Sequence, residues 1–259
     1  MIVSDDQFTS RSLYDGLEQD APPPPAPAER VAYWEDFMDI VYAPAAVFAR
    51  RATSGFGVPM LVVTALLALS FVVNRGVLQP IMDAEFARGV TAAMRKDPRV
   101  TMEQMAGFRT MLEKFALLFA IMGPLVVMLA VGLALWLAGK LVDARQSLGA
   151  AIMVASYAYV PRVLASIVSG IEGLIMDPAS LDGQYRVSIG PARFMDPDAT
   201  SPLVMGLVGR LDVFTLWITV LLAIGLSVTG RIPRRQAAMA AALVWFVGAV
   251  PALLTALRG

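Results

Sequence analysis

The sequence FALLFAIMGPLVVMLAVGLALWLAG, from Phe115 to Gly139, contains no charged residue and is long enough to cross a lipid bilayer as a helix. A bilayer core about 30 Å thick requires about 20 apolar residues in a helix, with a range of about 17–25. Four other runs in the chain meet this length: Val58–Leu78, Leu148–Met176, Val213–Gly230 and Ala237–Leu257. The runs lack the alternation of a membrane β-barrel. The sequence therefore predicts an all-α polytopic membrane protein with a bundle of five transmembrane helices.

Composition supports a membrane protein and removes several kinds of chemistry. Apolar residues make up 57% of the chain and charged residues 16%, which is below the roughly 25% of soluble proteins. The formal net charge is zero, so nothing in the charge balance favours binding of nucleic acid. The chain has neither cysteine nor histidine, which removes the reactive thiol, the commonest general base and the commonest transition-metal ligand. We therefore expect no enzyme activity, no cofactor and no metal site.

The first 30 residues differ in composition from the rest. They are polar and acidic, and they include the prolines Pro22–Pro25 and Pro27. A segment of low hydrophobicity cannot bury enough apolar surface to fold, and clustered prolines favour an extended polyproline conformation. We therefore expect residues 1–30 to be a disordered acidic tail that acts as a spacer, or alternatively carries a motif for a partner domain. Residues 31–257 are expected to form the membrane domain.

Just ahead of the first span, four apolar residues repeat with helical spacing. Trp34, Phe37, Met38 and Val41 follow the i, i+3, i+4, i+7 pattern of one helix face, and Asp36 lies off that face with its acidic neighbours. Tryptophan at headgroup depth is typical of helices that lie in the membrane interface. The pattern predicts an interfacial amino-terminal helix with Trp34, Phe37 and Val41 as candidate interface residues. The alternative is that this face packs on the bundle itself.

Residues 79–114, between the first two spans, are polar but have a helical pattern. A first helix should end near Asp97–Pro98. Thr101 followed by Gln104 has the spacing of a capping box, which predicts the start of a second helix. Together these features predict an extramembrane helical hairpin that extends the first two spans. Its methionines are predicted to form the internal seam: Met94, Met102, Met105 and Met111.

The short loops set the expected orientation. Lys140–Ser147 and Arg231–Gln236 are rich in basic residues, as is the Arg50–Arg51 pair ahead of the first span. Basic residues accumulate in short cytoplasmic loops. These three segments lie on one side of a five-span bundle, so the amino terminus is predicted to be cytoplasmic. Residues 79–114, on the opposite side, also carry basic residues and weaken this asymmetry.

Arg162 is the exceptional charge of the chain, because it lies near the middle of the third span, directly after Pro161. A charge at that depth costs several kcal/mol, and intramembrane ionisable residues are functional candidates. The structural alternative is that Pro161 kinks the helix and frees carbonyl groups that Arg162 then binds. In either case we expect the guanidinium to point into the bundle and to find carbonyl or carboxylate partners.

Two further charges lie near the far end of the bundle. Glu172 is close to the end of the third span and Arg210 precedes the fourth at similar depth, so we expect an ion pair between them. Ala165, Ser169 and Gly173 recur every four residues, a spacing that lets helices approach closely. In the longer loop 177–210, alternation at Tyr185–Ile189 predicts a short strand.

A family resemblance rests on the third span and its surroundings. The sequence SYAYVP, Ser156–Pro161, resembles the signature of the Yip family, with Tyr157 and Pro161 at the family's tyrosine and proline. The short loop Lys140–Ser147 and the pre-membrane segment Trp34–Phe48 are also similar to the family, and the resemblance covers about residues 33–257. It implies five spans and a cytoplasmic amino terminus. Eukaryotic members bind Rab-type GTPases, but no Rab-binding motif is evident here, and the polar inserts resemble bacterial members.

Two classes of function are consistent with these features. The first is a non-enzymatic scaffold or adaptor in a bacterial inner membrane, which organises partner proteins or membrane shape and contacts the lipid bilayer, protein partners or further copies of itself. The second is a small transporter or channel in which Arg162 lines a polar path. We favour the first, because a transporter needs a polar route between helices, and the spans contain no acid at mid-depth to complement Arg162. We expect no sealed polar cavity.

Overall fold

The computed structural model describes residues 32–250 and 253–254 of the 259-residue chain. The residues from Tyr33 onward form one compact unit. The acidic, proline-rich tail predicted for residues 1–30 lies outside the described residues. Within the described part every regular element is a helix, which confirms the all-α fold class.

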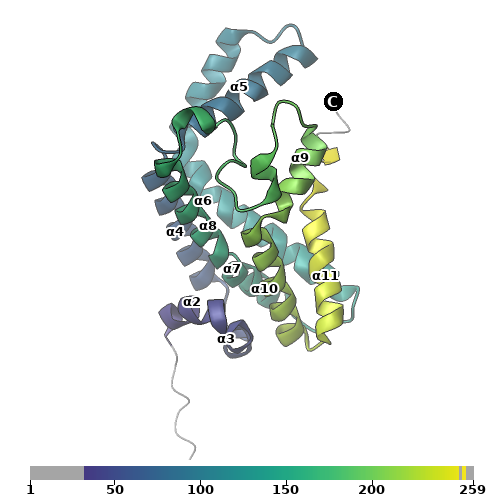
Figure 1. Ribbon diagram of the computed structural model, residues 1–259. Coiled ribbons are helices and arrows are strands. Elements are labelled where there is room, and N and C mark those ends of the chain that lie inside the picture. Colours follow the sequence, from purple (N-terminus) through teal and green to yellow (C-terminus); the bar gives the residue numbers. More distant parts are fainter. Residues whose placement is uncertain (1–31, 251–252, 255–259) are drawn as a thin grey trace, which may run out of the picture. The chain divides into compact units, whose positions relative to one another are not determined.

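Ten α-helices and three short 3₁₀ helices follow one another in the described part of the chain (Figure 1). In order they are α2 (Tyr33–Tyr42), α3 (Pro44–Arg51), α4 (Gly57–Asn74), α5 (Gln79–Lys96), α6 (Met102–Lys140), α7 (Leu148–Ala158), α8 (Val160–Ile175), η1 (Pro178–Ser180), η2 (Pro191–Phe194), α9 (Pro202–Val208), η3 (Gly209–Leu211), α10 (Val213–Gly230) and α11 (Arg234–Val247).

Four segments of the described structure are long and apolar enough to cross a membrane: α4, α6, α7 together with α8, and α10. They correspond to the first four predicted spans. The fifth predicted run starts within α11, which has 14 residues, fewer than the roughly 17–25 of a spanning helix. Gly248 caps α11, Gly248 and Ala249 form a turn, and Val250, Leu253 and Leu254 are helical again, with the Leu253 N–H bound to the Ala249 carbonyl at 3.1 Å. The predicted end of this run at Leu257 lies outside the described residues.

Between the first two spans, α5 and α6 form a helical hairpin at the opposite end of the molecule from α2 and α3 (Figure 1). The predicted capping box is present, because the Thr101 side chain accepts from the Gln104 N–H and the Gln104 side chain accepts from the Thr101 N–H. At about 1.5 Å per residue, the 39 residues of α6 span about 58 Å. This is about twice the thickness of the bilayer core, so the first part of α6 extends beyond it.

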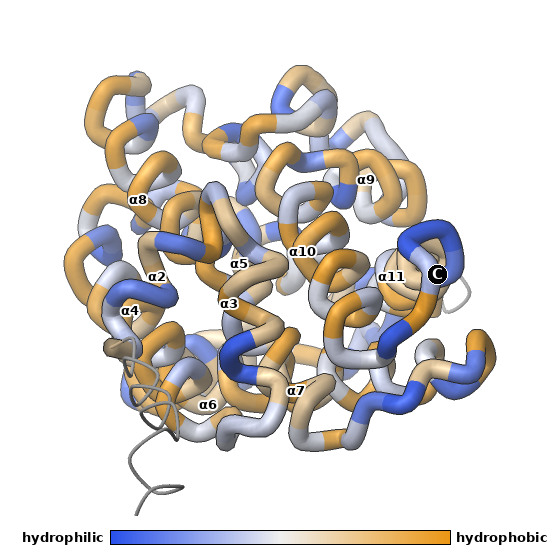
Figure 2. The backbone as a smooth tube through the Cα atoms, turned by 90° about the horizontal axis from the view of Figure 1, so that it is seen from below, coloured by the Kyte–Doolittle hydropathy of each residue, from blue (hydrophilic) through white to orange (hydrophobic). Residues whose placement is uncertain are grey.

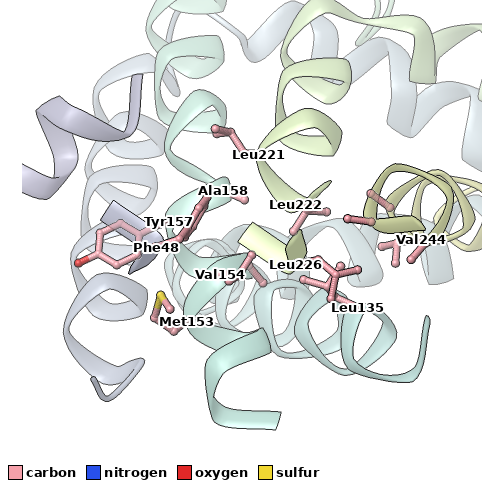
Figure 3. Close-up of a cluster of buried hydrophobic side chains, with 14 of the residues drawn as sticks. Phe48, Leu135, Met153, Val154, Tyr157, Ala158, Leu221, Leu222, Leu226 and Val244 are labelled. Atoms are coloured by element: carbon pink, nitrogen blue, oxygen red, sulfur yellow. The ribbon is translucent and has the colours of Figure 1, made fainter. Parts of the chain in front are cut away.

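The bundle is held together by a large apolar core near the α2–α3 end. It combines residues from six helices, and Figure 3 shows Phe48 beside Tyr157 on one side and Leu226 near Leu135 on the other. Small residues bring the helices together: a Cβ at Gly225 would collide with Val154, and one at Gly132 would lie 2.7 Å from the backbone of Ile152. The helices approach this closely only because these positions carry no side chain.

The outer surface of the spans is strongly apolar. Leu61 and Leu69 on α4 and Leu118 on α6 are each at least half exposed. Viewed from the α2–α3 end, hydrophobic residues run along the long helices and hydrophilic residues gather mainly in the connections (Figure 2). A soluble protein rarely exposes so large an apolar surface, so these side chains face lipid.

Two expectations for the polar segments are wrong. Residues Tyr185–Ile189 form hydrogen-bonded turns rather than a strand, with the Ser188 N–H bound to the Tyr185 carbonyl at 3.1 Å. Three of the four methionines predicted for the seam of the hairpin are exposed: Met102 by 64%, Met111 by 43% and Met94 by 37%. An ion pair at 2.7 Å, between Arg109 and Asp83, joins the two helices instead.

The orientation can be tested by single-cysteine labelling, because the chain has no native cysteine. Arg99→Cys and Arg235→Cys place a thiol at exposed positions at opposite ends of the bundle. With a cytoplasmic amino terminus, a membrane-impermeant maleimide added to intact cells should label the Cys variant of Arg99 and spare that of Arg235 until the cells are lysed. Labelling of the Arg235 variant alone would reverse the orientation.

Candidate functional site

The buried face of α2 carries an acid. Asp36 is fully buried, and its carboxylate accepts three side-chain hydrogen bonds. Oδ1 accepts from Arg50 Nε at 2.6 Å, and Oδ2 accepts from Arg51 Nε at 2.6 Å and from the Tyr157 hydroxyl at 2.8 Å. We call Asp36, Arg50, Arg51 and Tyr157 the Asp36 network. It ties α2 and α3 to α7.

The local sequence explains how the network forms. Pro44 lies in the first turn of α3, where its missing N–H costs nothing, and it lets the chain reverse direction after α2. The reversal returns Arg50 and Arg51 to Asp36. Arg50 also binds Asp39, and hydrogen bonds from Arg50 and then Tyr42 lower the pKa of Asp39. A buried carboxylate is tolerated only when its lone pairs are satisfied, and here charged donors supply that.

The orientation of α2 follows from this network. Trp34 is 69% exposed and Val41 is 45% exposed, so these predicted interface residues face outward. Phe37 is half-buried instead, and its ring centroid lies 5.5 Å from that of Tyr157. Trp34, Met38 and Val41 are thus not covered by the bundle and Phe37 is partly covered, an arrangement that agrees with that expected of an interfacial helix. The sequence analysis missed the role of Asp36, because it noted this acid only as lying off the apolar face of the helix.

The third span is interrupted where Pro161 was expected to kink it. Helix α7 ends at Ala158 and α8 begins at Val160, with Tyr159 between them. Pro161 lies in the first turn of α8 and has no N–H to donate to the preceding turn. The Arg162 N–H binds the Tyr159 carbonyl at 2.9 Å. The break therefore separates a lower half-span, α7, from an upper half-span, α8.

Above this break lies a cavity of about 610 Å³, near the hairpin end of the bundle. It is lined by the end of α4, by α8, by residues 184–189 and by the segment that leads into α10. Three arginines line it: Arg75, Arg162 and Arg210. We call this the arginine cavity. Arg75 and Arg162 are exposed side chains, so the cavity is open rather than sealed.

Arg162 does not find the partners expected of it. Within the described residues its guanidinium makes no hydrogen bond and no ion pair, and it lies in the wall of the arginine cavity. The physical reason is the cavity itself: a charged side chain within the spans that faces an open cavity can keep its water. Arg162 therefore lies at the predicted position in the third span but borders the arginine cavity, which the sequence pattern did not reveal.

The expected ion pair between Glu172 and Arg210 is absent. Glu172 binds Arg193 of the long loop at 3.1 Å, and Arg210 Nη1 donates to the Gly248 carbonyl at 3.0 Å. The Arg210 guanidinium also lies 5.1 Å from the centre of the Trp245 ring. The contact with Gly248 depends on its missing side chain, because a Cβ there would collide with Arg210.

The helical bundle, its lipid-facing apolar surface and its buried amino-terminal contacts define a polytopic integral membrane protein. The family profile of the Yip1 domain matches residues 38–255, and the chain belongs to this family. The predicted resemblance to the Yip family is thereby confirmed. No curated protein sequence and no solved structure gives a significant match to the chain.

The Asp36 network should be a main contributor to stability. We expect Asp36→Asn to lower the free energy of unfolding by about 3–5 kcal/mol, because it leaves two arginines without their buried carboxylate. Tyr157→Phe removes one hydrogen bond to a charged group and should cost about 1.5–3 kcal/mol. Asp39→Asn is the matched control, since that side chain is 24% exposed. Unfolding of the purified variants by SDS in mixed micelles measures all three, and equal losses for Asp36→Asn and Asp39→Asn would refute the assignment.

Proposed function

We propose that this protein is a non-enzymatic scaffold or adaptor, which contacts partner proteins through the α5–α6 hairpin. The observation that carries the proposal is the exposed apolar surface of the hairpin outside the bundle. Met102 is 64% exposed, Phe108 is 45% exposed and Met111 is 43% exposed, all on the part of α6 that precedes its apolar run. Methionine is a flexible side chain that adapts to varied binding surfaces. A connection between two spans would not need two helices of this length.

The second contact surface is the outward face of α2. Trp34, Met38 and Val41 are each at least 45% exposed, and the Asp36 network holds them in that orientation. A tryptophan and neighbouring apolar side chains fit the headgroup region of a bilayer. We place the protein in a bacterial inner membrane, with α2 on its cytoplasmic surface and the hairpin on the opposite side. Lipid and protein partners, or further copies of the chain, would then be contacted at opposite faces of the membrane.

The arginine cavity is the one observation that favours the second function, a small transporter or channel. A transport path would have to continue from Arg162 along α7 to the other side. All residues from Ala150 to Ala158 are buried, and Met153 and Val154 have no exposed surface. The described structure thus offers a binding cavity on one side and close packing beyond it. This supports binding rather than passage, and we keep the scaffold as the proposed function.

Partner contact by the hairpin can be tested with point substitutions. Deleting the hairpin is a poor test, because Ile81 of α5 packs against Leu181 and Val187 of the long loop. We expect Phe108→Ser combined with Met111→Ser to remove at least one co-purifying protein in mild detergent, because apolar contact area is lost. The unchanged chain and Glu103→Ser, on the same stretch of α6, should retain it.

The outcome is decided by quantitative mass spectrometry of the purified complexes, with equal membrane insertion of all variants. An identical set of partners for the double variant and Glu103→Ser would contradict the proposal. A separate flux assay on purified protein in vesicles addresses the alternative. Saturable flux of a solute that is lost in Arg162→Gln would replace the scaffold with a transporter.

A further inference from the structure

The arginine cavity has an excess of positive charge. Its lining contains Arg75 at the end of α4, Arg162 in the first turn of α8, Arg210 in η3 and a single acid, Asp212. Asp212 is the N-cap of α10, and its carboxylate is engaged with backbone groups. Oδ1 accepts from the Phe214 N–H at 3.0 Å and Oδ2 accepts from the Ile189 N–H at 2.9 Å. Asp212 thus stabilises the start of α10 and the preceding loop, and none of the three arginines is bonded to it.

The three guanidinium groups also lack carboxylate partners elsewhere. Among the described residues, Arg75 and Arg162 make no side-chain hydrogen bond or ion pair. In the described part of the chain the Arg210 guanidinium binds the Gly248 carbonyl and lies over the Trp245 ring, and its Nε is buried without a hydrogen-bond partner. Burial lowers the pKa of Arg210, which reflects the cost of holding a charge there without a counter-ion. Three arginines thus line one cavity in which the single carboxylate, that of Asp212, is bound to backbone N–H groups, so the positive charge of the lining is not paired.

The rest of the lining combines polar groups with an apolar wall. Ser70, Thr215 and Gln184 line the cavity with side chains that make no hydrogen bond within the described structure. The apolar part includes Leu67 and Phe71, on the same helix as lipid-facing Leu69 and Val73. The volume of about 610 Å³ falls within the roughly 300–1,000 Å³ of small-molecule sites. A bare inorganic anion would fill only a small part of it.

We propose that the arginine cavity binds a phosphate group, carried by a phospholipid headgroup or by a free phosphate. Guanidinium groups match phosphate oxygens with paired, charge-assisted hydrogen bonds. Arg162 and Arg210 would bind the phosphate oxygens, Arg75 would add charge at the rim, and Ser70 or Thr215 would donate from the side. The apolar wall formed by Leu67 and Phe71 favours a ligand with acyl chains, because a free phosphate would leave it in water.

The test uses the full chain purified in detergent with three probes: dihexanoyl phosphatidic acid, inorganic phosphate, and dihexanoyl glycerol, which has the same chains and no phosphate. Tryptophan fluorescence is the first readout, measured in a background with Trp34, Trp136 and Trp217 replaced by Phe, because the Trp245 ring centroid lies 5.1 Å from the Arg210 guanidinium. The thermal midpoint gives a second readout. The variants are Arg162→Gln, Arg75→Gln and, to retain the charge, Arg162→Lys. The matched control is Arg99→Gln, whose side chain is 91% exposed and lies outside the cavity.

We expect phosphatidic acid to change the tryptophan fluorescence in a saturable manner and to raise the thermal midpoint, with no effect of dihexanoyl glycerol. Arg162→Gln and Arg75→Gln should each weaken the apparent affinity at least tenfold, Arg162→Lys should restore part of it, and Arg99→Gln should leave it unchanged. Binding of inorganic phosphate with similar affinity and the same variant profile identifies a free anion as the ligand. Equal affinity in the control and in both cavity Gln variants, or no binding of either phosphate probe, overturns the proposal.

Discussion

The buried carboxylate of Asp36 determines how the amino-terminal segment sits on the bundle. A carboxylate without water needs donors for its lone pairs, and among the described residues Arg50, Arg51 and Tyr157 supply them. These bonds hold α2 and α3 against α7. The resulting orientation turns the charged edge of α2 inward and its apolar residues Trp34 and Met38 outward. Helix α2 therefore buries Asp36 together with Ile40 and leaves Trp34 and Met38 outside the bundle.

The two halves of the third span lie in different surroundings: α7 is closely packed, and α8 borders the arginine cavity. Nine of the 11 residues of α7 are buried, and small side chains let α6 and α10 approach it closely. Beyond the break at Tyr159, α8 contacts α4 through a polar side chain. The Asn74 side chain donates a hydrogen bond to the Ser166 carbonyl at 2.8 Å and occupies the space over Gly170. This contact holds α4 and α8 together beside the arginine cavity. Pro161 thus lies at the boundary between the packed core around α7 and the arginine cavity beside α8.

Local sequence patterns predicted the elements that depend on neighbouring residues. Length and hydropathy located four spanning segments, the capping box at Thr101 located the start of α6, and Pro161 located the break. The patterns could not reveal contacts between distant residues. The bond between Asp36 and Tyr157 joins positions 121 residues apart, and nothing in the helical periodicity of α2 distinguishes Asp36 from a solvated acid. The partner of Glu172 was wrong for the same reason, because the course of the long loop brings Arg193 closer than Arg210.

The hairpin and the arginine cavity share part of their structure. Ile81 and Met82 of α5 line the cavity, and Glu85 accepts a hydrogen bond at 2.9 Å from the N–H of Gln184, another lining residue. A ligand that fills the cavity would therefore lie beside residues 184–189, which also contact α5. Binding changes the hairpin only if the ligand has different affinities for two arrangements of these elements. The contacts around Glu85 and Ile81 are where such a difference would arise, since they join the cavity wall to the surface that we assign to partner proteins.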